Sequence, residues 1–341
     1  MILKSNNKYL VIRVKDKVIK YDLKTNSKLK NEYDRIKYLI NYDHFYQKHH
    51  IPVYNYKKKN IYHFKDKYSY EMPYFKGNSF SKILRNKNIS HKDKWNYINI
   101  LYFNFKRICL RKSEIDSNKK LVLWENKLKD VLKDLLNINY LKGLIDSPIK
   151  INNVIIENPK ILLLEFFNTG SNSFRVTDKI HGNFHSENII IPSNYDLNNF
   201  KLIDPDCNLK NMDPLFSLAR FFYTYVHDTI ENNKFDIISS INNSEIKSFV
   251  LQYLWVHPIN ESYLLIDKKI MEHKNNFKTS SISNRLLKCF IICLLIGVKA
   301  NENGMEIKNL KSNNISIKSN SLFLLLSAFY HVCTTINYKK I

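Results

Sequence analysis

The chain has 341 residues, of which 44 % are hydrophobic and 13 % aromatic, so it holds enough apolar material for a folded core. It has only six glycines, under 2 % of the chain against a usual share of about 7 %, and Gly77 is the first of them. Neither GxGxxG nor GxxxxGK[ST] can be written with these glycines, which excludes the Rossmann dinucleotide motif and the P-loop motif.

The first 76 residues predict a small mixed β/α region. Residues 7–23 alternate apolar and polar side chains on both sides of a Lys-Asp-Lys turn, which predicts a β-hairpin. Residues 27–48 have the apolar spacing of a helix. Short strands are then expected at 53–56, 61–64 and 68–72. Pro73, Gly77 and a Ser/Asn cluster predict a boundary here.

The remainder is predicted to be mainly helical with a β insert at 179–206. Helices are expected near 95–110, 126–138, 159–168, 215–231, 245–256, 262–273, 282–299 and 320–337. The chain therefore divides into a lobe of residues 1–76 and a lobe of residues 77–341. The five cysteines form no CxxC pair and are expected to be reduced, and the N-terminus has no signal-peptide pattern, so we expect a cytoplasmic protein without a transmembrane segment.

The segment from 179 to 206 contains the residues that point to a chemical function. A strand leads into the polar loop His181-Gly182, Asn188 precedes three isoleucines, and a second strand ends at Asp204. A hairpin with this order would bring Asn188 and Asp204 together. An amide oxygen and a carboxylate are hard oxygen ligands, and Mg²⁺ is typically held by one or two such groups plus substrate phosphates.

Three stretches of this region carry a resemblance to a known family. Residues 181–188 read His-Gly-Asn-Phe-His-Ser-Glu-Asn, 202–205 read Leu-Ile-Asp-Pro, and 213–220 contain Asp-Pro and Leu-Ala-Arg. In letters and order this resembles the HGDxHxxN, I-D and D-L-A-R patterns of the aminoglycoside phosphotransferase and choline kinase-like family. Within that family, the sequence Ile-Asp-Pro at 203–205 resembles the corresponding motif of bacterial polysaccharide-locus phosphotransferases.

The resemblance implies an α+β fold with two lobes, like a protein kinase: a small β-rich N-lobe and a larger, mainly helical C-lobe. It implies that Asn188 and Asp204 hold the metal and that position 183 is where the family has its catalytic aspartate. Two letters depart from the family pattern: residue 183 is Asn instead of Asp, and Ser217 stands where an Asp is usual. An amide cannot accept a proton near neutral pH, and loss of a general base costs about 10²–10⁴ in rate.

The catalytic candidates are therefore Asn183, His185 and His181. Phosphoryl transfer depends mostly on positioning and electrostatics, so Asn183 could still orient a hydroxyl group. His185 is a candidate substitute base, and its other reading is a histidine that braces the loop. Both an active kinase and an inactive pseudokinase remain open at this point.

A kinase-like N-lobe also needs a strand lysine for the phosphates and a helix carboxylate that orients it. Lys20 lies in the predicted hairpin and Glu32 at the start of the next helix, in the right order. Glu71 and Met72 lie in a segment that resembles the hinge between the lobes, where backbone groups would bind adenine. The loop that covers the phosphates would be residues 4–8, which contain no glycine.

The sequence thus favours a phosphotransferase that uses ATP and Mg²⁺ and acts on a hydroxyl group of a small molecule, with a sugar or glycan precursor as the preferred class. The alternative is a catalytically impaired pseudokinase that binds a nucleotide or a partner. The net charge is +23, and residues 1–76 contain 18 Lys and Arg against 7 Asp and Glu. This basic N-lobe allows an anionic surface or a glycan as a further partner; nucleic acid is a weaker reading of the same charge.

Overall fold

The structure is a computed structural model. It describes residues 1–5, 9–23, 28–61, 64–110, 130, 133, 144–152, 154–168, 177–206, 213–231, 236–240, 247–252, 280–300, 306–309 and 314–337. The chain forms two compact units. The first unit comprises Met1–Ser113 and Thr177–Phe221, and the second comprises Glu114–Val176 and Phe222–Ile341.

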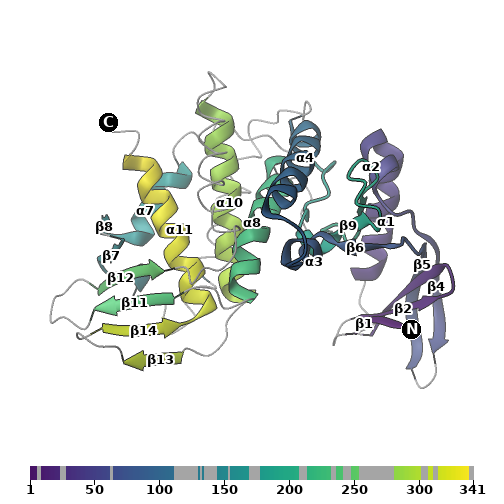
Figure 1. The fold of residues 1–341 in the computed structure, drawn as a ribbon, viewed down its shortest axis with the longest axis horizontal. Helices are drawn as coiled ribbons and strands as arrows, with labels where there is room; N and C mark the ends of the chain where they lie inside the picture. Colours follow the sequence, from purple (N-terminus) through teal and green to yellow (C-terminus); the bar gives the residue numbers. More distant parts are fainter. Residues whose placement is uncertain are drawn as a thin grey trace. The chain divides into compact units, whose positions relative to one another are not determined.

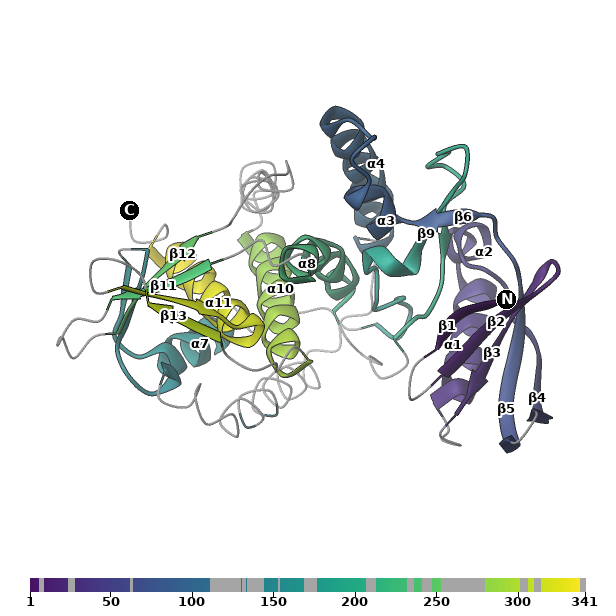
Figure 2. The same ribbon diagram turned by 60° about the horizontal axis from the view of Figure 1, so that its bottom comes forward.

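The first unit begins with a five-stranded antiparallel sheet (Figure 1), in the order β1-β2-β3-β5-β4, with all five strands labelled in Figure 2. Its strands are β1 (Ile2–Ser5), β2 (Tyr9–Val14), β3 (Lys17–Asp22), β4 (Tyr54–Ile61) and β5 (Phe64–Pro73). β2 and β3 form the hairpin that the alternation of apolar residues predicts, and Lys15 takes a positive φ of 56° in its turn. The hairpin prediction is confirmed, whereas the strands expected at 53–56, 61–64 and 68–72 join into two longer ones.

Two helices, α1 (Lys28–Tyr42) and α2 (His44–His49), follow β3. Leu29, Ile36 and Leu39 recur at helical spacing along α1 and are buried, so the helix packs its apolar face on the sheet (Figure 2). The single helix expected over 27–48 is interrupted at Asp43. The Asp43 side chain accepts a hydrogen bond from the backbone N–H of Phe45 and thereby caps a new helix.

The rest of the first unit contains a small three-stranded sheet, with the order β10-β9-β6, and several helices. Its elements are β6 (Gly77–Ser79), α3 (Phe80–Arg85), α4 (His91–Cys109), the short 3-10 helix η2 (Ser186–Asn188), β9 (Ile189–Pro192), β10 (Lys201–Leu202) and the start of α8 (Leu215–Glu231). Ile189 and Ile191 alternate on one face of β9 and are fully buried. The β insert predicted at 179–206 is confirmed by the pairing of β9 with β10.

The second unit contains a six-stranded sheet that the sequence analysis did not anticipate. Its strands, in sheet order, are β13 (Glu306–Asn309), β14 (Asn314–Lys318), β11 (Asp236–Ser240), β12 (Lys247–Gln252), β7 (Ile149–Ile151) and β8 (Val154–Ile156). β12 and β7 are parallel, and the other neighbours are antiparallel. The helix expected over 245–256 is therefore wrong, because β12 pairs with strands on both sides.

Three helices accompany this sheet: α7 (Pro159–Asn168), α10 (Ser280–Ala300) and α11 (Asn320–Asn337). α11 lies between the sheet and α10 (Figure 1, Figure 2). The described middle parts of α10 and α11 are almost entirely buried, as their apolar composition requires. α7, α8, α10 and α11 confirm the helices predicted near 159–168, 215–231, 282–299 and 320–337. The helices predicted near 126–138 and 262–273 fall almost entirely outside the described residues.

The α+β character that the sequence predicts is thus confirmed as a mixed structure with antiparallel sheets and many helices. The division at residues 76 and 77 stays a prediction. In the described part of the chain, no helix has the length and apolar character needed to cross a membrane. Cys109, Cys289, Cys293 and Cys333 are buried free thiols, while Cys207 lies outside the described residues.

Candidate functional site

Lys20 on β3 lies between two carboxylates of the first unit. Its Nζ is 2.7 Å from Oε1 and 2.9 Å from Oε2 of Glu32, and 2.8 Å from Oδ1 of Asp204. Lys20 and Glu32 are each only 4 % exposed, whereas the Asp204 side chain is 37 % exposed. We call these three residues the Lys20 cluster. It is closed on the Glu32 side and open to solvent on the Asp204 side.

The register of the sheet explains why Lys20 reaches these partners. Lys20 is paired with Tyr70 of β5, and residues directly opposite in an antiparallel pair share a face of the sheet. On this face Lys20 points toward α1, which presents Glu32 in its second turn. The hydroxyl of Tyr70 also donates a hydrogen bond to Glu32, and the Tyr9 ring lies 4.6 Å from the Lys20 ammonium.

Two carboxylates share one ammonium group in the Lys20 cluster. Burial alone would lower the pKa of Lys20, but the carboxylates of Asp204 and Glu32 outweigh it and raise that pKa above its ordinary value. Burial raises the pKa of Glu32 to about 7, although Lys20 pulls it down. The cluster therefore has one acidic group more than its lysine can balance, and additional positive charge beside Asp204 would be stabilised there.

The loop that leads to Asn183 is anchored through its backbone. Gly182 has a φ of 75°, which a glycine adopts without strain, and its N–H donates to Oγ of Ser217 at 2.8 Å. The N–H of His181 donates to the Tyr46 hydroxyl of α2 at 3.0 Å. The guanidinium of Arg35 on α1 donates to the carbonyl of Ile180 at 2.5 Å. The loop is thus held by α1, α2 and α8, and Ser217 provides the hydrogen-bond acceptor at the position where the family pattern has Asp.

Asn183, Asn188 and Asp204 lie together at the end of the β9–β10 hairpin. The side-chain amide of Asn183 donates to the carbonyl of Asp204 at 3.1 Å, and that of Asn188 donates to the carbonyl of Asn183 at 3.3 Å. The N–H of Ile203 donates to the Asn188 carbonyl at 3.0 Å, which sets Asn188 beside the chain that enters Asp204. Asp204 has a φ of 51°, a left-handed conformation that is uncommon for residues other than glycine. The contiguity of Asn188 and Asp204 that the sequence predicts is therefore present.

The chemistry of this pair fits a divalent cation. The NH₂ group of Asn188 is used in the hydrogen bond to Asn183, so its amide oxygen is the end that remains for a ligand contact. Asp204 uses Oδ1 for Lys20 and is partly exposed. Among the described residues no group of three or more His, Cys, Asp or Glu side chains forms a metal site. A site with two protein ligands is the kind that Mg²⁺ completes with water and phosphate oxygens.

The two predicted catalytic histidines differ in exposure. His181 is completely buried and its Nδ1 accepts from the N–H of Asn183 at 3.3 Å, so its side chain braces the loop. Burial lowers its pKa well below the ordinary value and keeps the ring neutral. His185 is half-buried, and its Nδ1 accepts from the N–H of Glu187 at 3.4 Å. This hydrogen bond makes the His185 side chain the N-cap of η2.

Glu71 and Met72 are not part of the Lys20 cluster. Glu71 is paired with Ile19 on one side and Tyr54 on the other, so its backbone lies inside the sheet. Its side chain accepts from Asn55 at 3.1 Å and from Lys17 at 3.4 Å, and the Asn55 hydrogen bond lowers its pKa. Met72 shares the face of Lys20 and belongs to the core. The segment outside the strands begins only after Pro73, at residues 74–76.

The sequence analysis missed several residues that support the site. Tyr70, Tyr46 and Arg35 support Glu32 and the Asn183 loop, yet no motif marks them. Only the two-residue period of β5 could have placed Tyr70 opposite Lys20. Of the expected phosphate-covering loop at 4–8, residues 4 and 5 end β1 and residues 6–8 lie outside the described residues.

Comparisons with known proteins find a likeness in structure but no match in sequence. A scan with protein-family models and a comparison with curated proteins find no match. Among solved structures, the chain is similar to a crystal structure of an aminoglycoside-3'-phosphotransferase of type VIII, with 11 % sequence identity and a TM-score of 0.45. The similarity covers 85 % of this chain and 92 % of that one.

Proposed function

We propose that this protein is a kinase-like phosphotransferase that uses ATP and Mg²⁺ and transfers a phosphoryl group to a hydroxyl group of a small molecule. The observation that carries the proposal is the Lys20 cluster, in which one buried lysine contacts a helix carboxylate and the carboxylate of Asp204. In kinases, a lysine of the third strand and a glutamate of the following helix form such a pair, and a separate aspartate binds the metal. Lys20 lies on the third strand and Glu32 on the helix after it.

Each residue then has a role in binding or orientation. Lys20 contacts the phosphates of ATP, Glu32 and Tyr70 hold Lys20 in place, and Asn188 and Asp204 hold Mg²⁺. The metal, when bound, neutralises charge on the terminal phosphates. Asn183 orients the acceptor hydroxyl. His185, two residues further along the chain, assists Asn183 at the acceptor hydroxyl, and His181 acts as a positioning residue through the Asn183 N–H.

The proposal includes a two-lobed arrangement with an N-terminal lobe of residues 1–76 and a C-terminal lobe of residues 77–341. The adenine would contact backbone groups after β5. Because Glu71 is paired on both sides, residues 74–76 are better candidates than Glu71 and Met72. We assign the acceptor to sugars or glycan precursors on the resemblance of the motifs, and the protein to the cytoplasm on its free cysteines and the lack of a signal-peptide pattern.

A second candidate function is a nucleotide-binding module without turnover. It is favoured by the hydrogen bond from the Asn183 amide to the carbonyl of Asp204, because a carboxylate at position 183 could not donate it. Asn183 therefore stabilises the left-handed backbone of Asp204 and is suited to support a metal ligand. It is not suited to accept a proton from the substrate.

Turnover of ATP by the purified protein, measured with Mg²⁺ against a panel of sugars, tests the first proposal. We expect turnover with at least one sugar, and a decrease in kcat/KM of about 10²-fold or more in Asp204→Asn, because removal of one stabilising charge at a transition state costs this much. Asp34→Asn is the matched control, since Asp34 is an exposed acid of the same unit that pairs only with Lys30 among the described residues. Equal loss in both variants, or no Mg·ATP binding by calorimetry, would contradict the proposal.

Asn183→Asp separates the two candidates. In an active enzyme the substitution changes an existing rate, whereas in a binding module it creates turnover where none was measurable. If the wild-type chain binds Mg·ATP with no turnover and Asn183→Asp turns over, the binding module is the correct assignment. Turnover by the wild-type chain excludes it.

A further inference from the structure

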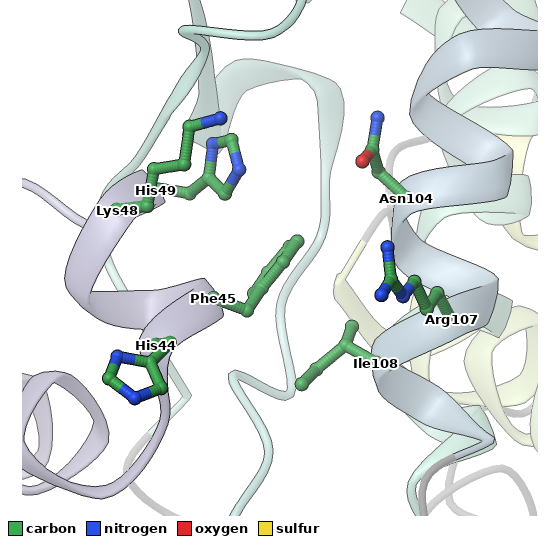
Figure 3. Close-up of a pocket in the computed structure, with 7 residues that line it drawn as sticks. All are labelled: His44, Phe45, Lys48, His49, Asn104, Arg107 and Ile108. Atoms are coloured by element: carbon green, nitrogen blue, oxygen red, sulfur yellow. The ribbon is translucent and has the colours of Figure 1, made fainter.

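A pocket of about 240 Å³ lies between α2 and α4 of the first unit. It shares no residue with the Lys20 cluster or the Asn183 loop. Phe45 reaches into it from α2, and Asn104, Arg107 and Ile108 reach into it from α4 (Figure 3). Its other lining residues are His44, Lys48 and His49 of α2.

The lining of this pocket is positively charged. Lys48 and Arg107 are exposed and come from different helices, and the lining residues include no acid. In the described part of the chain, neither of these two cations has a carboxylate partner. Asp43, the acid next to the pocket in sequence, is directed to the N–H of Phe45 at 2.7 Å as the cap of α2. An anion in the pocket would therefore meet two positive charges that no described carboxylate compensates.

Aromatic rings that pack on one another form one surface of the pocket. The Phe45 ring lies 4.8 Å from the ring of His49, which stacks on Phe200 at 4.1 Å. His49 is hydrogen-bonded to the carbonyl of Phe200 through Nδ1 at 3.1 Å, so its ring is fixed and donates there. Burial lowers the pKa of His49 to about 4, and the ring is therefore neutral at pH 7. Phe45 thus presents a supported aromatic surface.

The wall formed by α4 adds one polar group and one apolar group. The side-chain amide of Asn104 donates to the carbonyl of Ile100 at 3.0 Å, which leaves its oxygen as the end that faces the pocket (Figure 3). Ile108 is half-buried and completes the apolar surface beside Phe45. Two cations, one acceptor and an aromatic surface in a small cavity are the chemistry of a site for an anion with a flat apolar body.

We propose that this pocket binds a small aromatic phosphate monoester, with the phosphate held by Arg107 and Lys48 and the ring packed on Phe45 and Ile108. The guanidinium of Arg107 matches the geometry of a phosphate, and a doubly charged group uses both cations better than a carboxylate. The aromatic ring of such a ligand can pack on the Phe45 ring in a stacked or edge-on geometry. The proposal does not depend on phosphotransferase activity, because the pocket is separate from the Lys20 cluster.

Calorimetric titration of this chain with phenyl phosphate tests the site. We expect saturable binding that weakens at least about tenfold in Arg107→Gln and in Lys48→Gln, as the loss of a charged hydrogen bond does. Lys92→Gln is the control: Lys92 is an exposed lysine of α4, fifteen residues and roughly 22 Å along the helix from Arg107, and its substitution should leave the affinity unchanged.

Two further titrations complete the test. Inorganic phosphate should bind at least about tenfold more weakly than phenyl phosphate, and Phe45→Leu should reduce that difference, because the ring contributes through Phe45. Asp204→Asn should bind phenyl phosphate as the wild type does, since a ligand in this pocket does not touch the Lys20 cluster. Equal affinity in Arg107→Gln and wild type, equal affinity for the two phosphates, or loss of binding in Asp204→Asn would each overturn the proposal.

Discussion

Nζ of Lys20 and Oδ1 of Asp204 lie 2.8 Å apart, although 184 residues separate them in the sequence. This contact connects the N-terminal sheet with the end of the β9–β10 hairpin. Since Glu32 contacts the same ammonium group, one lysine links β3, α1 and the segment that follows β10. The stability of the first unit should therefore depend on Lys20 more than on any exposed lysine.

Lys20→Met should lower the free energy of unfolding of the first unit by about 3–5 kcal/mol, because it leaves Glu32 buried without its cation. The double variant Lys20→Met with Glu32→Gln should recover most of this loss, since no uncompensated charge remains. Urea denaturation of the two single variants and the double variant measures the coupling.

The matched control is the exposed pair of Lys30 and Asp34, whose Nζ and Oδ1 are 2.8 Å apart on α1. Lys30→Met should cost less than about 1 kcal/mol, because exposed ion pairs contribute little. If both lysine variants lose the same stability, or if Glu32→Gln adds its own loss to that of Lys20→Met, the buried ion pair is not the source of the effect.

Ser217→Ala should destabilise the protein by about 1–3 kcal/mol, because it leaves the buried N–H of Gly182 without the oxygen that accepts it. The Asn183 loop should also become less well positioned, so amide hydrogen exchange at Gly182 should speed up. Ser193 is an exposed serine of the turn after β9, and Ser193→Ala should change stability by less than about 0.5 kcal/mol. Unchanged exchange at Gly182 in Ser217→Ala would contradict this account.

The parts of the site that the sequence could predict are those set by local order. The strand of Lys20 and the helix of Glu32 are both visible as periodic patterns, and the hairpin that ends at Asp204 follows from short apolar runs around a polar loop. The contacts of Tyr70 and Tyr46 depend on strand register and on helix packing, which no local pattern encodes. The break between α1 and α2 depends on one capping aspartate that lies within an otherwise helical pattern.

The sheet of the second unit shows the other limit. β12 has the apolar run Phe249, Val250 and Leu251, which by periodicity alone fits a helix as well as a strand. Its partners are β11 nearby and β7, which lies almost a hundred residues earlier. β7 and β8 have only three residues each, so neither carries a period that can be recognised. Pairing between distant short strands is therefore the information that the sequence patterns lack.

Gly77→Ala should disrupt the small sheet of β6, β9 and β10, in which β9 directly follows Asn188. A Cβ atom at position 77 would lie 2.2 Å from the carbonyl oxygen of Ile191 and 2.9 Å from its carbonyl carbon, so the backbone of β9 would have to move. Overpacking of this kind costs about 1–3 kcal/mol. Because Asn188 directly precedes β9, the same shift should weaken Mg·ATP binding in calorimetry under the proposed function.

The neighbouring Asn78 is exposed on the same strand, and Asn78→Ala should change both the stability and the nucleotide affinity little. An unchanged free energy of unfolding in Gly77→Ala would contradict this prediction, because it would show that β9 can move away from the added methyl group without loss of stability. Reduced stability together with unchanged Mg·ATP affinity would separate the small sheet from the metal ligands.

The pH dependence of stability should be dominated by three buried histidines of the first unit. Burial lowers the pKa of His49 and of His50 to about 4 and that of His181 well below its ordinary value. In the unfolded chain these groups titrate near 6.5, so between pH 6.5 and 4 the unfolded state binds three more protons at these positions. The contribution of these three histidines to stability is full above pH 6.5 and is lost as the pH falls.

Glu32 acts in the opposite direction, because its pKa rises to about 7 from an ordinary value of 4.5. In this window the folded state binds one more proton at Glu32, so three protons from the histidines are offset by one. The net slope should be about two protons, with each proton worth about 1.4 kcal/mol per pH unit. Urea denaturation at pH 7, 6 and 5 should show a decreasing free energy of unfolding.

His50→Asn tests the origin of this slope, because the amide of Asn can replace the Nδ1–H that His50 donates to the carbonyl of Ile51 at 2.9 Å. The variant has no group at position 50 that titrates, so its slope should be smaller than that of the wild type by about one proton. The other titrating groups are common to both proteins, and the one in contact with His50 is His181, whose ring lies 5.4 Å away and whose pKa His50 helps to lower. An unchanged slope in His50→Asn would mean that the imidazole of His50 is protonated in the folded state without cost, which its complete burial makes unfavourable.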